Sequence, residues 1–301
     1  MGIQKISEHI HVNLEYQLAN VTCIDTGDGL VLVDTPTMPE EITHWKDFID
    51  SMKETSVEYI IATHHHFDHI IGNNRLGGNV IMHEKAFKSM REEGSTLIQA
   101  LAPNLPGITQ EKIDFLLSEP LISPKITFGD MMCLQLGDLT LKLFHVGGHT
   151  TGSLCVYVEE DKVLLSGDNV TVDQHPFRGH GDHIEWIKAL RWMKGLEIDT
   201  IVPGHGGKCG AEQLDRVIEY LSRLWYLTES LVKKGAGLDE VIAETRNRMF
   251  DFFYVEPERL EEMTLLFDAG TPRLYDEILS RISSQKRGPQ NTRLPCKHSV
   301  V

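Results

Sequence analysis

The sequence predicts a mixed α/β fold, and three observations support that class. Short β-branched runs recur along the chain, and several of them end at histidine or aspartate. Segments with apolar residues three and four positions apart, the spacing of amphipathic helices, alternate with these runs. The chain has 301 residues, of which 41% are hydrophobic and 24% charged, as is typical of soluble globular proteins with one large core or two ordinary ones.

The first elements are expected to be strands. The runs VTCIDT and LVLVDT flank Gly27-Asp28-Gly29, which is a strong signal for a hairpin turn. Residues 39–54 are predicted to form a helix, because Pro39 and two acidic residues occupy its first turn. A further strand, VEYIIAT, then runs directly into a block of histidines.

The middle of the chain changes character. Residues 84–124 show helical spacing on both sides of the segment PNLPG and are predicted to form a helical insertion. Strands return at LTLKLFHV, SLCVYV and KVLLSGD, followed by a helix at IEWIKALRWMKGL and a strand at TIVPGHG. The runs GDGLVLVD and EEDKVLLSGD resemble each other, and the strands VEYIIAT and IDTIVPG both lead directly into histidine. If the chain consists of two related halves that face each other, the ends of these strands would lie together.

The C-terminal part is expected to be helical. From Leu214 onward, apolar residues keep the spacing of one helix face, which we expect to pack on the core. Residues from about 283 are polar and lack periodicity, which predicts a mobile tail. The predicted organisation is a catalytic core at 1–209, a helical extension at 210–282 and a flexible tail at 283–301.

Charge and targeting signals narrow the class of partner. The formal net charge of -15 disfavours nonspecific binding to nucleic acid or anionic membranes, which depends on clustered Lys and Arg, so we expect a small-molecule substrate. The N-terminal residues lack a secretory signal, and no stretch is long and apolar enough to span a membrane, which predicts a cytoplasmic protein. Five scattered cysteines indicate reduced thiols, and homo-oligomerisation is left open.

The segment THHHFDH carries the strongest chemical signal. His64 and His66 are two positions apart, so in extended backbone they point to one side while His65 points away. One isolated histidine would more often be a surface or capping residue, but this clustering favours a site for a borderline divalent metal such as zinc. The first candidate ligands are His64 and His66, followed by Asp68 and His69. Three more stand beside glycine at strand-to-loop junctions: His149, Asp168 and His205.

On these residues the chain resembles the metallo-β-lactamase superfamily of metallohydrolases. The His-x-His-x-Asp-His motif and the ligands that follow it match in order, over about the first 210 residues. The resemblance implies a four-layer αββα sandwich with the site along one edge of its two sheets. It also implies two divalent metal ions, expected to be zinc, with iron or manganese left open. One ion would be held by His64, His66 and His149, the other by Asp68, His69 and His205, and Asp168 would bridge them.

The implied chemistry is hydrolysis of an ester, thioester, lactone or amide. Metal ions lower the pKa of a bound water to about 7 in the well-studied single-zinc case, so a hydroxide bridging the two ions would be the nucleophile. Asp68 would orient it and take up its proton. The bridging Asp168 stands where true β-lactamases have cysteine or serine, and the segment after it lacks the Gly-Cys-Gly-Arg type of sequence found in glyoxalase-II thioesterases.

Other functions on the same fold stay open at this point. A phosphodiesterase could use the same metal pair, although the acidic composition disfavours a long nucleic acid. An iron oxidoreductase is a second alternative, but His66 stands where flavodiiron relatives have glutamate. A noncatalytic binding protein is a third, which the intact ligand set disfavours.

Residues outside the metal set are expected to support it or to contact substrate. Asp34 ends a strand and is predicted to hold the motif loop in place. The loop after Asp168 could bring His175, Arg178 or His180 to the substrate, although solvated loop positions are commoner. The segment FDFFY shows no clean alternation, so we predict that Phe252 and Phe253 partly line an apolar entrance over the metals.

Overall fold

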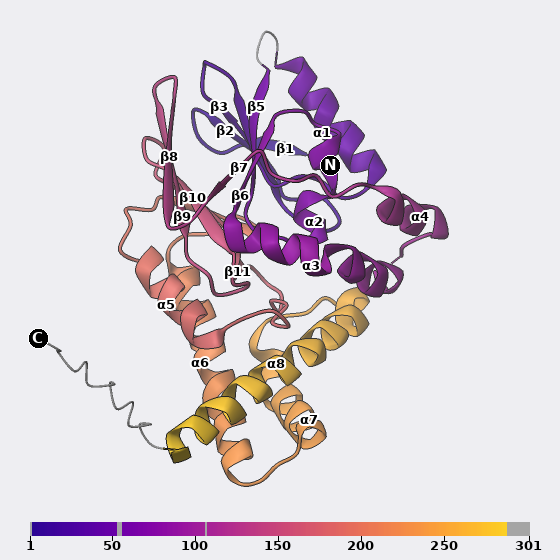
Figure 1. Cartoon of the computed structure of the whole chain (residues 1–301), viewed down its shortest axis with the longest axis vertical. Coiled ribbons are helices and arrows are strands. Elements are labelled where there is room, and N and C mark those ends of the chain that lie inside the picture. Colours follow the sequence, from indigo (N-terminus) through magenta and orange to yellow (C-terminus); the bar gives the residue numbers. More distant parts are fainter. Residues whose placement is uncertain (1, 53–55, 106, 288–301) are drawn as a thin grey trace, which may run out of the picture.

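The computed structural model describes residues 2–52, 56–105 and 107–287, and within them two β-sheets face each other (Figure 1). The first sheet has seven strands in sequence order: β1 (Ile3–Lys5), β2 (Ile10–Asn13), β3 (Val21–Asp25), β4 (Leu30–Val33), β5 (Val57–Ala62), β6 (Asn79–His83) and β7 (Ile126–Phe128). The second has five, in the order β12 (Thr200–His205), β11 (Val163–Thr171), β10 (Leu154–Val158), β9 (Leu139–His145) and β8 (Met131–Leu136).

Each sheet combines an antiparallel part with a parallel part. The expected hairpin is confirmed, since β3 and β4 pair antiparallel across the turn in which Gly27 adopts a φ of 80°. The strands β4, β5, β6 and β7 then pair parallel. In the second sheet, β11 and β12 also pair parallel. The strands β4 and β5 resemble β11 and β12 in sequence, and each of these two pairs is parallel within its own sheet.

Side chains on the two faces of each sheet build separate apolar layers. Along β4, Val31 and Val33 point between the sheets, whereas Leu30 and Leu32 pack against α1 (Pro39–Ser51), as the period of two requires. The outer face of the second sheet is covered by α5 (His183–Met193) and α6 (Glu212–Lys233). Helices thus cover both outer faces, and the expected four-layer αββα sandwich is confirmed.

The predicted insertion is helical. It contains α3 (Glu84–Leu101), a 3₁₀ turn η2 (Ala102–Asn104) and α4 (Gln110–Ser118), and it follows β6. Two short helices, α2 (Phe67–Ile70) and η1 (Ile71–Asn74), lie between β5 and β6. The histidine-rich segment therefore passes from β5 directly into these two short helices.

The C-terminal helices share a core with the second sheet. They are α6, α7 (Leu238–Met249), the turns η3 (Phe250–Phe252) and η4 (Pro257–Arg259), and α8 (Leu260–Arg287). The predicted stripe of α6 is buried in this core through Leu214, Val217, Leu221 and Leu224. In the described part of the chain, no helix combines the length and apolar character that a membrane span needs.

The expected start of a tail near residue 283 is wrong, because α8 continues through Arg287. Leu274 and Ile278 are buried in the shared core, and Ile282 packs against it one turn later. This stripe carries the helix past the predicted boundary. Residues 288–301, the rest of the predicted tail, lie outside the described residues.

Candidate metal centre

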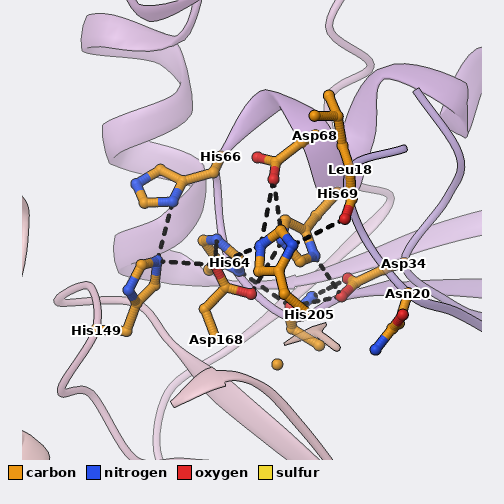
Figure 2. Close-up of polar contacts among 12 residues, drawn as sticks. Leu18, Asn20, Asp34, His64, His66, Asp68, His69, His149, Asp168 and His205 are labelled. Atoms are coloured by element: carbon orange, nitrogen blue, oxygen red, sulfur yellow. Dashed lines mark hydrogen bonds and ion pairs between the residues drawn. The ribbon is translucent and has the colours of Figure 1, made fainter. Parts of the chain in front are cut away.

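The seven predicted ligands lie together at one edge of the sandwich, on segments from both sheets. His64 and His66 follow β5, and Asp68 and His69 lie in α2. The other three come from the second sheet: His149 from the loop after β9, Asp168 from β11 and His205 from the end of β12. Figure 2 shows the imidazole rings converging on the Asp168 carboxylate.

The first group combines His64, His66, His149 and Asp168, all buried, and could hold a metal ion. His149 Nε2 lies 3.0 Å from His66 Nδ1 and 3.4 Å from Asp168 Oδ2. His64 Nε2 lies 3.8 Å from the same carboxylate oxygen. Three imidazole nitrogens and one carboxylate oxygen therefore face one point, as in a tetrahedral zinc site.

The second group combines Asp68, His69 and His205 and could hold another ion. Asp68 Oδ2 lies 3.5 Å from both His69 Nε2 and His205 Nε2. Asp168 reaches this group too, with Oδ1 3.1 Å from His69 Nε2 and Oδ2 3.1 Å from His205 Nε2. The Asp168 carboxylate thus lies between the two groups.

Hydrogen bonds on the outer ring nitrogens orient these imidazoles. His69 Nδ1 lies 2.8 Å from Asp34 Oδ2, and the Asp34 carboxylate also accepts from the Thr63 backbone N–H and hydroxyl, each at 2.8 Å. His64 Nδ1 lies 3.0 Å from the Thr63 hydroxyl oxygen, and His205 Nδ1 lies 2.8 Å from the Leu18 carbonyl oxygen. These partners place the ring proton on Nδ1 and leave the Nε2 lone pair facing the centre, the arrangement found around metal ligands.

Burial keeps the first group of imidazoles neutral. Burial, reinforced by neighbouring imidazoles, lowers the pKa of His64 and His66 well below 6.5. Burial likewise lowers the pKa of His149 to about 3. A neutral imidazole offers a lone pair, which is the form that binds a metal ion.

Carboxylates dominate the second group. Burial opposes a charge on His69 and His205, but Asp168 and Asp68 outweigh it and raise the pKa of both rings above 6.5. Burial would also raise the pKa of Asp168, yet the surrounding imidazoles lower it well below 3.8. Asp168 is therefore ionised at neutral pH.

Several central atoms make no aligned hydrogen bond within the described residues. They are His64 Nε2, His69 Nε2 and Asp168 Oδ1, all buried, although the last two lie 3.1 Å apart as an ion pair. Burying such atoms without well-aligned partners is costly, and their positions are those from which ligands would reach a divalent cation. The residues present therefore fit the metal ions that the motif predicts.

The backbone around the centre is tightly constrained. Asp34 has a φ of 58°, a strained conformation for a residue other than glycine, and it is the residue that holds His69. Gly204 packs so closely that a Cβ atom there would lie 1.9 Å from Asp168 Oδ1. The glycine beside the ligand His205 therefore permits this close approach.

Three of the predicted substrate contacts, Phe252, Phe253 and His175, pack in the C-terminal core. Phe253 is 1% exposed and Phe252 packs against the same C-terminal core, where both rings contact Tyr220. The expectation that they line an entrance over the metals is wrong, because Phe253 is buried in this core and Phe252 packs against α6. His175 is also fully buried, and its ring nitrogens contact the Tyr220 hydroxyl and the Phe250 carbonyl.

Arg178 is a buried structural contact rather than a loop residue facing substrate. Its side chain is 0% exposed and donates to the Phe267 carbonyl at 2.7 Å, with the guanidinium 4.9 Å from the centre of the Phe267 ring. It therefore joins the loop after β11 to α8. Sequence inspection alone could not reveal this contact, because the two residues are 89 positions apart.

His180 is the loop candidate that lies beside the metal centre. Its Nδ1 lies 2.8 Å from His66 Nε2, whereas His66 Nδ1 faces His149 in the first ligand group. His65 points away from the two central groups, as expected, and stacks on His180 with ring centroids 5.5 Å apart. Sequence analysis did not identify Thr63 or the Leu18 carbonyl as partners of the ligands. Threonine side chains and backbone carbonyls occur throughout the chain, and these contacts form only in the folded protein.

Comparison with known proteins agrees with this geometry. Residues 17–205, more than half of the chain, match the family described as the metallo-beta-lactamase superfamily. The chain belongs to the metallo-beta-lactamase superfamily. A crystal structure of a family protein from Thermus thermophilus is similar, with a TM-score of 0.68, 18% identity, and coverage of 93% of this chain and 95% of that one.

Two curated relatives of this superfamily member are named as thioesterases. An acyl-coenzyme A thioesterase of Gallus gallus is 28% identical over 176 residues, or 54% of this chain and 62% of that protein. An atrochrysone carboxyl ACP thioesterase of Aspergillus fumigatus is 24% identical over 242 residues, or 73% of this chain and 48% of that protein. The chain thus spans less than two thirds of the length of either relative. Relatives of this kind support an enzyme of the hydrolase class.

Proposed function

We propose that this chain is a dinuclear metal-dependent hydrolase that cleaves an acyl thioester. The observation that carries the proposal is the position of Asp168, whose two carboxylate oxygens lie 3.1 to 3.8 Å from imidazole nitrogens of both ligand groups. A carboxylate can bind two cations at once and offset part of their charge. Two ions are therefore a better match than one to seven ligands in two groups.

The names of the relatives favour the thioester bond. Two of the aligned relatives are named as thioesterases, although the carrier differs between them, and another is named as a linear primary-alkylsulfatase. We expect zinc, because imidazole and carboxylate ligands suit it, and metal analysis would distinguish iron or manganese. When bound, such ions supply Lewis acidity and make hydroxide available at neutral pH.

The protein residues have separate tasks in this proposal. His64, His66 and His149 are buried and neutral, so they would hold one ion rigidly. Asp68 and His205 are the most open of the seven ligands, with 17% of each side chain exposed, so the acyl carbon would approach on their side. Asp68 would accept the proton of the attacking water and pass it to the departing thiolate.

A metal and substrate panel tests the proposal. Reconstituted protein should contain about two metal ions per chain by elemental analysis, and chelation should abolish turnover. Among an ester, a thioester, a lactone, a β-lactam and a phosphodiester, the thioester should have the highest kcat/KM. A stoichiometry of one, oxygen consumption with bound iron, or preference for the phosphodiester would overturn the proposal.

A further inference from the structure

A small cavity lies beside the first ligand group, between the helical insertion and the C-terminal helix. It has a volume of about 220 Å³. Ser89 and Glu93 of α3 form one wall and Arg273 of α8 another. Of the remaining lining residues, His65 and Thr150 are next to predicted metal ligands in the chain and Thr151 follows Thr150, whereas Gly179 and His180 lie in the loop after β11.

Every lining residue is polar or glycine. An apolar acyl chain would gain little from such walls and would bury their hydrogen-bonding groups, so the cavity suits a polar part of a ligand. Drug-sized ligands fill pockets of about 300–1,000 Å³, so this volume admits one small group and not a whole substrate. The cavity is therefore a candidate subsite next to the metal centre.

Several lining groups have unused hydrogen-bonding capacity. His65 is 2% exposed, and neither ring nitrogen makes an aligned hydrogen bond to the described residues, although Glu93 Oε1 is 3.0 Å from Nε2. Arg273 donates from Nε to the Gly181 carbonyl at 2.8 Å and has no carboxylate at ion-pair distance in the described ranges. Within those ranges, the Ser89 hydroxyl also has no partner.

Charge decides which polar group fits. Arg273 contributes one positive charge and Glu93 one negative charge. An anion attracted by Arg273 would also face the Glu93 carboxylate. A neutral group with both a donor and an acceptor, such as an amide, would satisfy both side chains.

The cavity is close enough to the metal centre to serve the same ligand. His180 lines it, and His180 Nδ1 is 2.8 Å from His66 Nε2. Thr150 directly follows the predicted ligand His149, and His65 lies between two others. A substrate whose reacting bond is at the metals would need only a short arm to reach the cavity.

We propose that this cavity binds an amide in the thiol arm of the substrate, so that the enzyme prefers thioesters of amide-bearing thiols. The inference rests on the proposed thioesterase function and adds where the leaving group is recognised. Arg273 would donate to the amide oxygen, and Glu93 would accept from the amide N–H. The acyl chain would lie elsewhere.

Paired substrates and variants test this subsite. Thioesters with one acyl chain would carry either N-acetylcysteamine or an alkanethiol of equal length. In Arg273→Met, kcat/KM should fall about tenfold for the amide-bearing thioester, the loss expected for one hydrogen bond to a charged group, and less than twofold for the alkyl thioester. Ser89→Ala should cause a smaller loss of the same selectivity. Arg91→Met is the matched control, because Arg91 is exposed on α3, contacts Phe87 and lies outside the cavity.

A binding measurement separates the subsite from the chemistry. N-acetyl-S-methylcysteamine cannot form a thiolate, and its binding to the metal-loaded protein can be followed by saturation-transfer NMR. Binding that depends on Arg273 would support the subsite even if no thioester were hydrolysed, in which case the proposed function alone would fail. Equal losses for both thioesters, or Arg273-dependent binding of inorganic phosphate in place of the probe, would overturn the inference.

Discussion

Replacing Gly204 with alanine tests the central position of Asp168. The new Cβ would lie 1.9 Å from Asp168 Oδ1 and 2.9 Å from the Asp168 backbone nitrogen. Ordinary contact begins at 3.4 Å, so the carboxylate oxygen would have to move by about 1.5 Å. Metal sites tolerate deviations of only about 0.2 Å in ligand distance, so this shift would remove Asp168 from its place between the two groups.

The expected size of the effect follows from this overlap. Overpacking a buried position typically costs about 1–3 kcal/mol. If the protein relieves the overlap by displacing Asp168, this cost appears in metal binding, which would weaken about 5- to 150-fold. Gly207→Ala is the matched control, since a Cβ there would have no atom within 4 Å and Gly207 is also close to His205 in the chain.

Competition with a chromophoric chelator would measure the metal affinity of both variants. Circular dichroism and the midpoint of thermal unfolding would show whether Gly204→Ala keeps its fold. We expect weaker metal binding and lower turnover in Gly204→Ala and wild-type values in Gly207→Ala. Wild-type affinity in a folded Gly204→Ala protein would refute the role of Asp168 in holding metal.

Three further substitutions have defined outcomes. Asp168→Asn keeps the side-chain shape but removes the charge between the ligand groups, so kcat should fall about 100-fold or more; an unchanged kcat would contradict its role. Gly270→Ala should lower the free energy of unfolding in urea by about 1–2 kcal/mol despite the helix propensity of alanine, because its Cβ would lie 2.8 Å from Arg178 Cβ. Burial alone would raise the pKa of Glu277, but its bond with His183 outweighs burial and lowers it. The stability that Glu277 adds is therefore complete above pH 4.5 and lost in stronger acid, so the unfolding midpoints of Glu277→Gln and wild type should differ at pH 7 and converge as the pH falls below 4.5. A constant difference would exclude this titration.

The metal ligands could be predicted because their signal is local. His64, His66, Asp68 and His69 are within six residues, and His205 ends a strand beside glycine. The residues that orient these ligands could not be predicted in the same way. The Leu18 carbonyl reaches its histidine across 187 positions, and any residue type offers a carbonyl oxygen.

The segment FDFFY, which was wrongly predicted to line an entrance, shows a second reason why sequence analysis fails. Its lack of alternation is real, because Phe250, Asp251 and Phe252 form a 3₁₀ turn and neither a strand nor a long helix. What the sequence does not show is that Tyr220 and Phe267, on two separate helices, pack against its aromatic residues. A cluster of aromatics without periodicity therefore could not be assigned to a surface or a core before its neighbours were known.

Each ligand group draws side chains from both sheets, which links metal supply to the amount of folded protein. His64 and His69 follow β5 of the first sheet, whereas Asp168 and His205 belong to the second. Bound ions would cross-link the two sheets, and an ion at 100 times its dissociation constant adds about 2.7 kcal/mol to the stability of the state that binds it. In a cell short of metal, the protein would then lose abundance through degradation as well as activity, and its half-life would report how much metal is available.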